Sequence, residues 1–500
     1  MKRFLALFCV LAMIFTLCSC RESRVETIGE SYFEGEEVIE TESGTVNGDK
    51  NSNAEGNNAS GNGDGNSNIK NPLKADLKGA TVTIYDVGGV FAPDSSKSKT
   101  DAAKAEMIKK LQKELNCKLV VKQTDESKLA SLAAASAAGG QALCQIITTP
   151  IYKSGYFISS NLVADMGKIS SIDLSKDYMN VANMPEATRF GNGRYAVAAD
   201  TTVAAGVVYN KRILKELGYK DNYIYDLVDS GKWTYTEFRK LAKAALKDLD
   251  GKPGMSVEDQ WGIAIMDRST AGTADLLASA NTPMIKLENG KLVSNMTNAN
   301  IAKVAALMRE TYRTDGTVIN NNGSKIDGTK AHDAFKSGKV FMEYTTSEVM
   351  YWYSNMNDEY GFVPTPKFDG AKNYTSALDW NYKCLMVPAG LSAKDQYNAG
   401  AVVQAYMYLM QDIYEVRKKE YVNRYFCDDK SGENLLIAMK GVTVHPAQCY
   451  AQINEAILSG TYRVFWNHVS DGASVAAAVE STGSSLKKSL EELNVRIKDK

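Results

Sequence analysis

The stretch "RYAVAADTTVAAGVVYNKRILKELG", residues 194–218, contains the pattern that decides the fold. Two short apolar runs are separated by a polar turn at Asp200 and Thr201, and the second run leads directly into a helical pattern. Asn210 is a favoured first residue of such a helix, and Gly218 is a favoured stop. The stretch therefore predicts two strands, the second followed at once by a helix, which is the building unit of α/β folds.

Segments upstream of this stretch alternate between strand and helix patterns. Three apolar segments have strand patterns, namely "ATVTIYDV" (80–87), "CKLVVKQ" (117–123) and "ALCQIIT" (142–148). Helical patterns separate them, one running from Met107 to Leu115 and one in "ESKLASLAAASAAGG" (126–140). Such alternation predicts a parallel sheet with right-handed crossovers, in which ligands bind at the carboxyl ends of the strands. The loops at these ends contain Phe91 and Tyr152, which are therefore candidate ligand contacts.

Segments downstream add a helix, further strands and a helical end. In "KWTYTEFRKLAKAALKDLDG" (232–251), Thr234 and Glu237 have the spacing of a capping box. Apolar residues at helical spacing continue from there to Leu249, and we expect Trp233 to pack against the start of the helix. Strand patterns follow in residues 339–344, 360–370 and 376–390, and the chain is mostly helical from residue 394.

The residues after the strand "KVFMEY" form a further candidate site. Thr346 and Glu348 lie where a helix is expected to begin. If that helix points at a ligand, its N-terminal amides favour an anionic or polar group, and simple capping is the open alternative. Asp200 and Thr201, in the turn described above, are candidates on the same terms, with a plain loop as the alternative.

These motifs occur in an order that resembles the family 1 extracellular solute-binding proteins, the lipoprotein receptors of ATP-binding-cassette (ABC) sugar importers. The segments that carry the resemblance run from about residue 78 to 420: "VVYNKRILKELG", "WTYTEFRKLAKAALKD", "DQWGIAI", "AFKSGKVFMEYTTSE", "YGFVPTPKFDG" and a Trp-containing strand that ends at "MVPAG". The resemblance implies an α/β, two-lobed, periplasmic-binding-protein-like fold with hinge strands and a helical C-terminal part. It implies an N-lobe at about 73–195 plus a later returning segment, and a C-lobe that takes most of about 205–500.

The resemblance also implies where the ligand binds. Trp380 in "ALDWNY" matches a family position that often faces the interlobe cleft, where it would stack on a sugar ring while Asp379 or Asn381 binds hydroxyls; core packing is the alternative. The family often has Gly-Gly-Ser-Trp where this chain has Thr345–Glu348. Peptides, polyamines and phosphorylated or uronic sugars therefore stay open beside plain oligosaccharides.

The N-terminus has the features of an exported lipoprotein. Lys2 and Arg3 precede an apolar run that is too short to span a bilayer, as in a signal peptide. The run ends at Leu17–Cys20, which resembles the bacterial lipobox. We therefore expect a signal peptide at residues 1–19 and a diacylglycerol thioether with further acylation, such as palmitate, on Cys20. Two or more acyl chains would hold the protein stably on a membrane.

The segment after the lipobox has the composition of a flexible tether. Residues 20–72 are rich in Glu, Asn, Gly and Ser and contain few apolar residues, so we expect a disordered linker between the lipidated cysteine and a solute-binding domain at 73–500. The near-neutral net charge of −1 argues against a nucleic-acid partner. We expect a monomer on the extracellular face of a Gram-positive cell membrane, with a small-molecule solute and ABC permease subunits as partners.

Cofactor and enzyme functions find little support. The three histidines are scattered, and the five cysteines after residue 100 are widely spaced with no CxxC motif, so no metal site and no cofactor are expected. Ser96 and Lys99 match the S-x-x-K motif of penicillin-recognising hydrolases, and "SSN" (159–161) and three copies of "KSG" match its companions. We reject this reading because such short motifs of common residues recur by chance. A glycosidase, which needs two carboxylates about 5–10 Å apart, stays the other enzymatic alternative.

Overall fold

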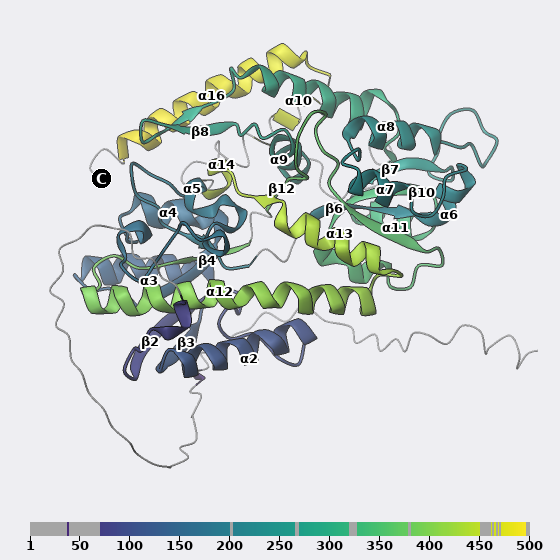
Figure 1. Cartoon of the computed structure of the whole chain (residues 1–500). Coiled ribbons are helices and arrows are strands. Elements are labelled where there is room, and N and C mark those ends of the chain that lie inside the picture. The colour runs from purple at the N-terminus through teal and green to yellow at the C-terminus, as the bar shows by residue number, and fades with distance from the viewer. Residues whose placement is uncertain are drawn as a thin grey trace, which may run out of the picture. The chain divides into compact units, whose positions relative to one another are not determined.

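The computed structural model describes residues 38–39, 71–200, 204–265, 270–319, 328–378, 382–450, 462, 465–466, 469 and 472–496 (Figure 1). The chain divides into two units at Glu37 and Val38, and every described residue belongs to the second unit. The expected signal peptide, Cys20 and nearly all of the expected linker lie outside the described residues. Among the described helices, none combines the length and the apolar character needed to cross a bilayer.

The first sheet contains the strands predicted from the N-terminal half. Its six strands are β1 (Val38–Ile39), β2 (Ala80–Asp86), β3 (Cys117–Gln123), β4 (Ile146–Pro150), β5 (Val197–Ala198) and β13 (Lys383–Met386), in the order β1-β3-β2-β4-β13-β5. β2 is parallel to both β3 and β4, which confirms the predicted parallel arrangement. The crossover helices are α2 (Lys99–Glu114) and α3 (Glu126–Ala138). β13 returns from late in the chain and pairs antiparallel with β4 and β5.

The second sheet is formed by the middle of the chain. Its strands are β6 (Ala205–Asn210), β7 (Trp261–Ile265), β10 (Val340–Thr346) and β11 (Tyr360–Pro364), in the order β11-β6-β10-β7. β6 is antiparallel to β10 and β11, and β10 is parallel to β7. Helices α6 (Lys211–Glu216), α8 (Tyr235–Ala244) and α11 (Gly328–Lys336) accompany these strands. The Asn210 side chain accepts a hydrogen bond from the Ile213 amide at 3.1 Å, so the helix start predicted at Asn210 is confirmed.

Apart from two long helices, described in the next paragraph, the remaining elements are short. They are η1 (Pro72–Lys74), η2 (Ile151–Lys153), α4 (Ser154–Ser159), η3 (Met166–Lys168), η4 (Asp177–Met179), η5 (Val181–Asn183), α5 (Met184–Ala187), α7 (Tyr223–Asp229), α9 (Thr270–Ser279), β8 (Ile285–Glu288), β9 (Lys291–Ser294), α10 (Ala299–Arg309), η6 (Glu310–Thr314), η8 (Ser347–Tyr353), β12 (Ser376–Ala377), α13 (Asp429–Lys440), β14 (Val442–Thr443) and α14 (Pro446–Cys449).

Two long helices complete the fold. α12 (Ala393–Arg424) lies alongside α2, and α16 (Val475–Arg496) packs against β9 and α10 (Figure 1). α12 is the element that confirms the helical C-terminal region expected from the sequence. Its first half is buried with one face of the first sheet, in a core that contains Val82, Ile84, Val402 and Tyr406. A second, larger core is continuous from the other face of this sheet to the second sheet.

Two local predictions were wrong and one was right. The helix that begins after Thr234 ends at Ala244, and Leu249 is 53% exposed instead of extending the apolar face. The turn at residues 248–259 replaces the last helical turn, because the Asp259 carboxylate accepts hydrogen bonds from the backbone amides of this turn. The helix expected after β10 is the 3₁₀ segment η8, in which the Thr346 side chain makes no capping bond. Trp233 is buried edge-to-face against Phe238, as predicted.

Candidate functional site

Asp200 lies at the point where the chain leaves the first sheet. Its Oδ2 atom accepts a hydrogen bond from Lys104 Nζ of α2, and Arg417 Nη2 of α12 is 3.9 Å from the same oxygen. The three side chains are only 12–13% exposed. Two helices therefore bring two cations to Asp200, one of the candidate residues predicted from the sequence.

The charge of Arg417 is maintained despite this burial. Burial is the largest single influence and by itself disfavours a charged guanidinium, but the Asp200 carboxylate and its weaker neighbours, Asp101 among them, together outweigh burial and raise the pKa of Arg417. The hydroxyls of Tyr382 and Tyr421 also interact with this charge. Arg417 is thus a permanent and largely buried cation, able to bind carboxylate, phosphate or hydroxyl oxygens.

A second carboxylate of α12 fixes this helix to α2. Glu420 is 8% exposed and accepts hydrogen bonds from the amides of Lys99 and Thr100, at 3.1 and 3.0 Å, and from the Thr100 hydroxyl at 2.6 Å. These are the orphan amides of the first turn of α2, and a carboxylate also complements the positive end of the helix dipole. Since Arg417 is three residues before Glu420, this contact also determines where Arg417 lies relative to Lys104.

The loop after β2 is held by a buried carboxylate. Asp86 is fully buried and accepts hydrogen bonds from the amides of Val90 and Phe91, at 3.0 and 2.9 Å, and from the Thr148 hydroxyl at 2.8 Å. Burial raises the pKa of Asp86, and these donors offset part of that effect. Gly88 has φ +86°, and a Cβ there would meet the Lys383 side chain at 2.7 Å. The loop therefore requires glycine at this position, with the Lys383 stem passing over it.

The two aromatic candidates of the first sheet are packed inward. Phe91 is 3% exposed, and its ring is 4.8 Å from the ring of Tyr406. Tyr152 is 9% exposed, and its hydroxyl donates a hydrogen bond of 2.5 Å to Glu126. Burial, followed by this bond to Glu126, raises the pKa of Tyr152. Ligand contact by these two residues stays a prediction.

The candidates after β10 lie next to Ala204, the residue that precedes β6. Ser347 exchanges two hydrogen bonds with the backbone of Ala204, at 2.9 and 3.1 Å, which places η8 beside the residue that follows 201–203. Thr346 is half-buried and Glu348 is exposed. Ligand contact by these two residues stays a prediction. The 3₁₀ geometry weakens the argument for a helix N-terminus here, because only the short η8 is present.

Four candidates from the sequence are outside the described residues. They are Thr201, Asp379, Trp380 and Asn381. The described ends next to them are Asp200, Ala204, Leu378 and Tyr382. Asp200 lies near Arg417, and the Tyr382 hydroxyl interacts with the Arg417 charge.

Residues of α12 were missed by the sequence reasoning. Tyr414, Arg417 and Tyr421 are spaced by three and four residues, so they share one face of the helix, and Tyr425 follows as its C-terminal cap. The Tyr421 ring packs edge-to-face on Tyr425 at 5.2 Å. The signal was available in "DIYEVRKKEYVNRYF", where polar aromatics recur at helical spacing, but it is indistinguishable there from an ordinary half-buried face.

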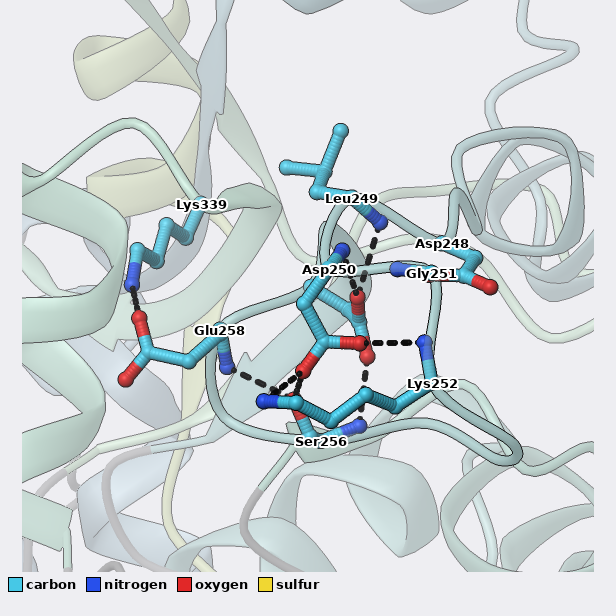
Figure 2. A network of polar contacts seen from close by, with 9 residues as sticks. Asp248, Leu249, Asp250, Gly251, Lys252, Ser256, Glu258 and Lys339 are labelled. Atoms are coloured by element: carbon cyan, nitrogen blue, oxygen red, sulfur yellow. Dashed lines mark hydrogen bonds and ion pairs between the residues drawn. The ribbon is translucent and has the colours of Figure 1, made fainter.

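An acidic turn in the second sheet's surroundings is the one group of described residues that could hold a metal. Asp248, Asp250 and Asp259 each have an oxygen within 4.8 Å of the others. Asp259 accepts hydrogen bonds from three backbone amides. The Lys252 ammonium is 3.2 Å from Asp250 (Figure 2). The amides lower the pKa of Asp259 to about 2. Backbone amides and a lysine already bind these carboxylates, so we assign no ion to the turn.

More than half of the chain matches one known protein family. The family described as bacterial extracellular solute-binding protein matches residues 95–407. The chain belongs to this family. A search of curated proteins found no match.

Solved structures share the fold of this solute-binding protein. The cyclic α-maltosyl-1,6-maltose binding protein from Arthrobacter globiformis matches with a TM-score of 0.58 and 14% identity, over 83% of this chain and 100% of that one. A cyclo/maltodextrin-binding protein complexed with maltotetraose matches with a TM-score of 0.53 and 13% identity, over 84% of this chain and 97% of that one. The predicted α/β, periplasmic-binding-protein-like fold, two-lobed with hinge strands, is therefore confirmed.

The hydrolase-like motif has a structural explanation in this solute-binding protein. The Ser96 hydroxyl donates to Asp94 at 2.7 Å, in the exposed turn before α2, and Lys99 is the first residue of that helix. The S-x-x-K motif relies on its lysine as the partner of the serine, whereas the Ser96 hydroxyl donates to a carboxylate of its own exposed turn. The family and the structural relatives are solute-binding proteins.

Proposed function

We propose that this chain is a membrane-anchored extracellular receptor that binds a carbohydrate, most simply an oligosaccharide, and delivers it to an ABC permease. The observation that carries the proposal is the family match over residues 95–407. Two relatives of the same fold bind maltodextrin-type sugars according to their descriptions, which favours a carbohydrate over a peptide or polyamine. Binding by domain closure would need no catalytic residue.

The proposed solute site lies between two lobes, where the first and second sheets are joined. The N-lobe would be the first sheet with its returning β13 and the first half of α12, and the C-lobe would be the second sheet with its helices. Asp200, Thr201, Glu348 and Thr346 belong to the connection between them in this proposal, and Trp380 would supply the aromatic platform with Asp379 or Asn381 binding hydroxyls. Phe91 and Tyr152 would support the N-lobe side.

A thermal-shift screen tests the choice of solute. Purified protein is heated with neutral oligosaccharides, with short peptides and with polyamines. A ligand present at 100 times its Kd should raise the free energy of unfolding by about 2.7 kcal/mol. Stabilisation by a peptide or polyamine alone would refute the carbohydrate proposal. Turnover of aryl glycosides or nitrocefin would show that the protein is an enzyme and would refute the receptor proposal.

The lipid anchor is tested separately at Cys20. Its support is the short apolar run that ends in a lipobox-like Leu17–Cys20. A Cys20→Ala variant expressed in a Gram-positive host should leave the membrane fraction or keep its signal peptide, because no thioether can form. A variant that stays membrane-bound at the mature mass would contradict the anchor, and Cys18→Ala is the matched control.

A further inference from the structure

The guanidinium of Arg417 lacks the acceptors that its burial demands. Its Nε atom is buried and has no hydrogen-bond partner within the described part of the chain. Among the described residues, Asp200 is the carboxylate within 4 Å, and its distance of 3.9 Å from Nη2 is too long for a hydrogen bond. A buried charged donor without an acceptor is costly, so such a group in a folded protein calls for an explanation.

The charges around Arg417 do not balance. Lys104 and Arg417 share one oxygen of Asp200, and Lys104 is hydrogen-bonded to it while Arg417 is not. Among the described residues, two cations therefore face one carboxylate. Within the part of the chain that the structure describes, this group of three side chains has a net charge of +1, and Arg417 is the cation that is not hydrogen-bonded to the carboxylate.

The other acidic groups nearby already have partners of their own. Glu420 is bound by the amides and the hydroxyl at the start of α2. Asp101 accepts a hydrogen bond from the Ser98 hydroxyl, and the Ser98 side chain accepts one from the Asp101 amide in return. These acids reduce the local potential, but they do not supply an acceptor to the Arg417 fork.

The position of this cation relates it to the solute site. Asp200 is the last described residue before 201–203, and the chain enters the second sheet at Ala204. Tyr382, the first described residue after 379–381, interacts electrostatically with Arg417. Arg417 therefore lies near described residues at the ends of both segments that contain the candidates Thr201 and Trp380.

We infer that Arg417, with Lys104 beside it, binds an anionic oxygen group of the solute, and that the solute is an acidic saccharide. This inference rests on the proposed carbohydrate function and narrows its substrate class. A guanidinium fork matches two oxygens of a carboxylate, sulfate or phosphate in a planar, bidentate manner, while an ammonium acts as a point charge. A cationic solute such as a polyamine would be repelled by the same residues.

Matched pairs of saccharides test the inference. Affinities of the purified protein are measured by calorimetry for oligogalacturonate and its methyl ester, for a sulfated galactan oligomer and its desulfated form, and for maltose 6′-phosphate and maltose. We expect at least one anionic member to bind at least 10-fold more tightly than its neutral mate, with an affinity that falls as salt rises. The pair that shows this preference identifies the source of the anionic group.

Substitutions test whether Arg417 and Lys104 cause the preference for the anionic saccharide. Arg417→Gln and, independently, Lys104→Gln should reduce the preference to below about 3-fold, while Arg417→Lys should retain part of it for a carboxylate. Lys419→Gln removes the same charge from an exposed position of the same helix and should leave the preference unchanged. Urea unfolding of each variant identifies any that fails to fold. If one glutamine variant fails to fold, the affinities of the other glutamine variant decide the test.

Two results would overturn the inference and separate it from the proposed function. If neutral oligosaccharides bind as tightly as their anionic mates, or if both glutamine variants keep the preference, Arg417 has no anionic partner and the carbohydrate receptor stands. If no saccharide of either kind binds, both the inference and the proposed function are wrong.

Discussion

Replacement of Phe91 by alanine separates a core role from a ligand-binding role. The ring is 3% exposed and is 4.8 Å from the ring of Tyr406, so almost its whole surface is buried between the loop after β2 and α12. Removing a buried phenylalanine ring costs about 3–5 kcal/mol, of which the aromatic pair accounts for roughly 0.5–1.5 kcal/mol. The Asp86 contacts to the loop amides use the backbone and remain in the variant. We therefore expect Phe91→Ala to lower the free energy of unfolding in urea by about 3–5 kcal/mol.

The affinity for a solute should respond differently to the same change. A side chain that does not touch the solute should alter Kd by less than about 3-fold, whereas a contact aromatic typically costs 2 kcal/mol or more on truncation. Phe91→Leu, which largely fills the same volume, is the matched control and should cost less than about 1.5 kcal/mol. A Phe91→Ala variant with nearly unchanged stability and a 30-fold weaker affinity would refute the packing argument and would indicate that Phe91 contacts the solute.

Three further predictions concern Glu420, Asp259 and Trp380. Glu420→Ala should lower the free energy of unfolding by about 2 kcal/mol, because it removes a charged cap of α2. The control Glu415→Ala, at an exposed position of α12, should change this free energy by less than about 0.5 kcal/mol, and equal effects of the two variants in urea would contradict the prediction. Asp259 has a folded pKa of about 2, below the usual value of 3.8, so its stabilisation is present above pH 4 and is lost as pH falls toward 2. The melting temperatures of the parent and Asp259→Asn should therefore converge over that range, and a constant gap would disprove it. Trp380→Ala should weaken binding by a few kcal/mol without changing urea unfolding; a loss of stability instead would make Trp380 a core residue.

The sequence predicted the sheet architecture well because periodic burial leaves a strong pattern. β2, β3 and β4 and the helix start at Asn210 were all visible in alternating or capped segments. Leu249 shows where such patterns fail: its spacing fits a helical stripe, but the helix stops at Ala244 because Asp259, ten residues after Leu249 and outside the stripe, accepts the amide hydrogen bonds of the turn. A local pattern does not contain information about that acceptor.

The candidate site was predicted only in part, since it depends on contacts between distant segments. Asp200 was found because it lies in a polar turn between two strands. Its partners, Lys104 and Arg417, are 96 positions before it and 217 positions after it, and each is one of many lysines and arginines on amphipathic helices. Only the packing of α12 along α2 brings them together, so no spacing in the sequence could identify them.

The position of α12 makes stability and solute binding depend on the same few contacts. Glu420 fixes the helix to α2 of the first sheet, while the Tyr360 hydroxyl donates to the Tyr425 carbonyl and so joins the end of the helix to the second sheet. Arg417 lies one turn from the first contact and two turns from the second. Loss of Glu420 would therefore displace Arg417 as well as the start of α2. If Arg417 binds the solute, Glu420→Ala should weaken binding in addition to lowering stability, whereas Asp259→Asn, in a turn remote in sequence from α12, should lower stability alone.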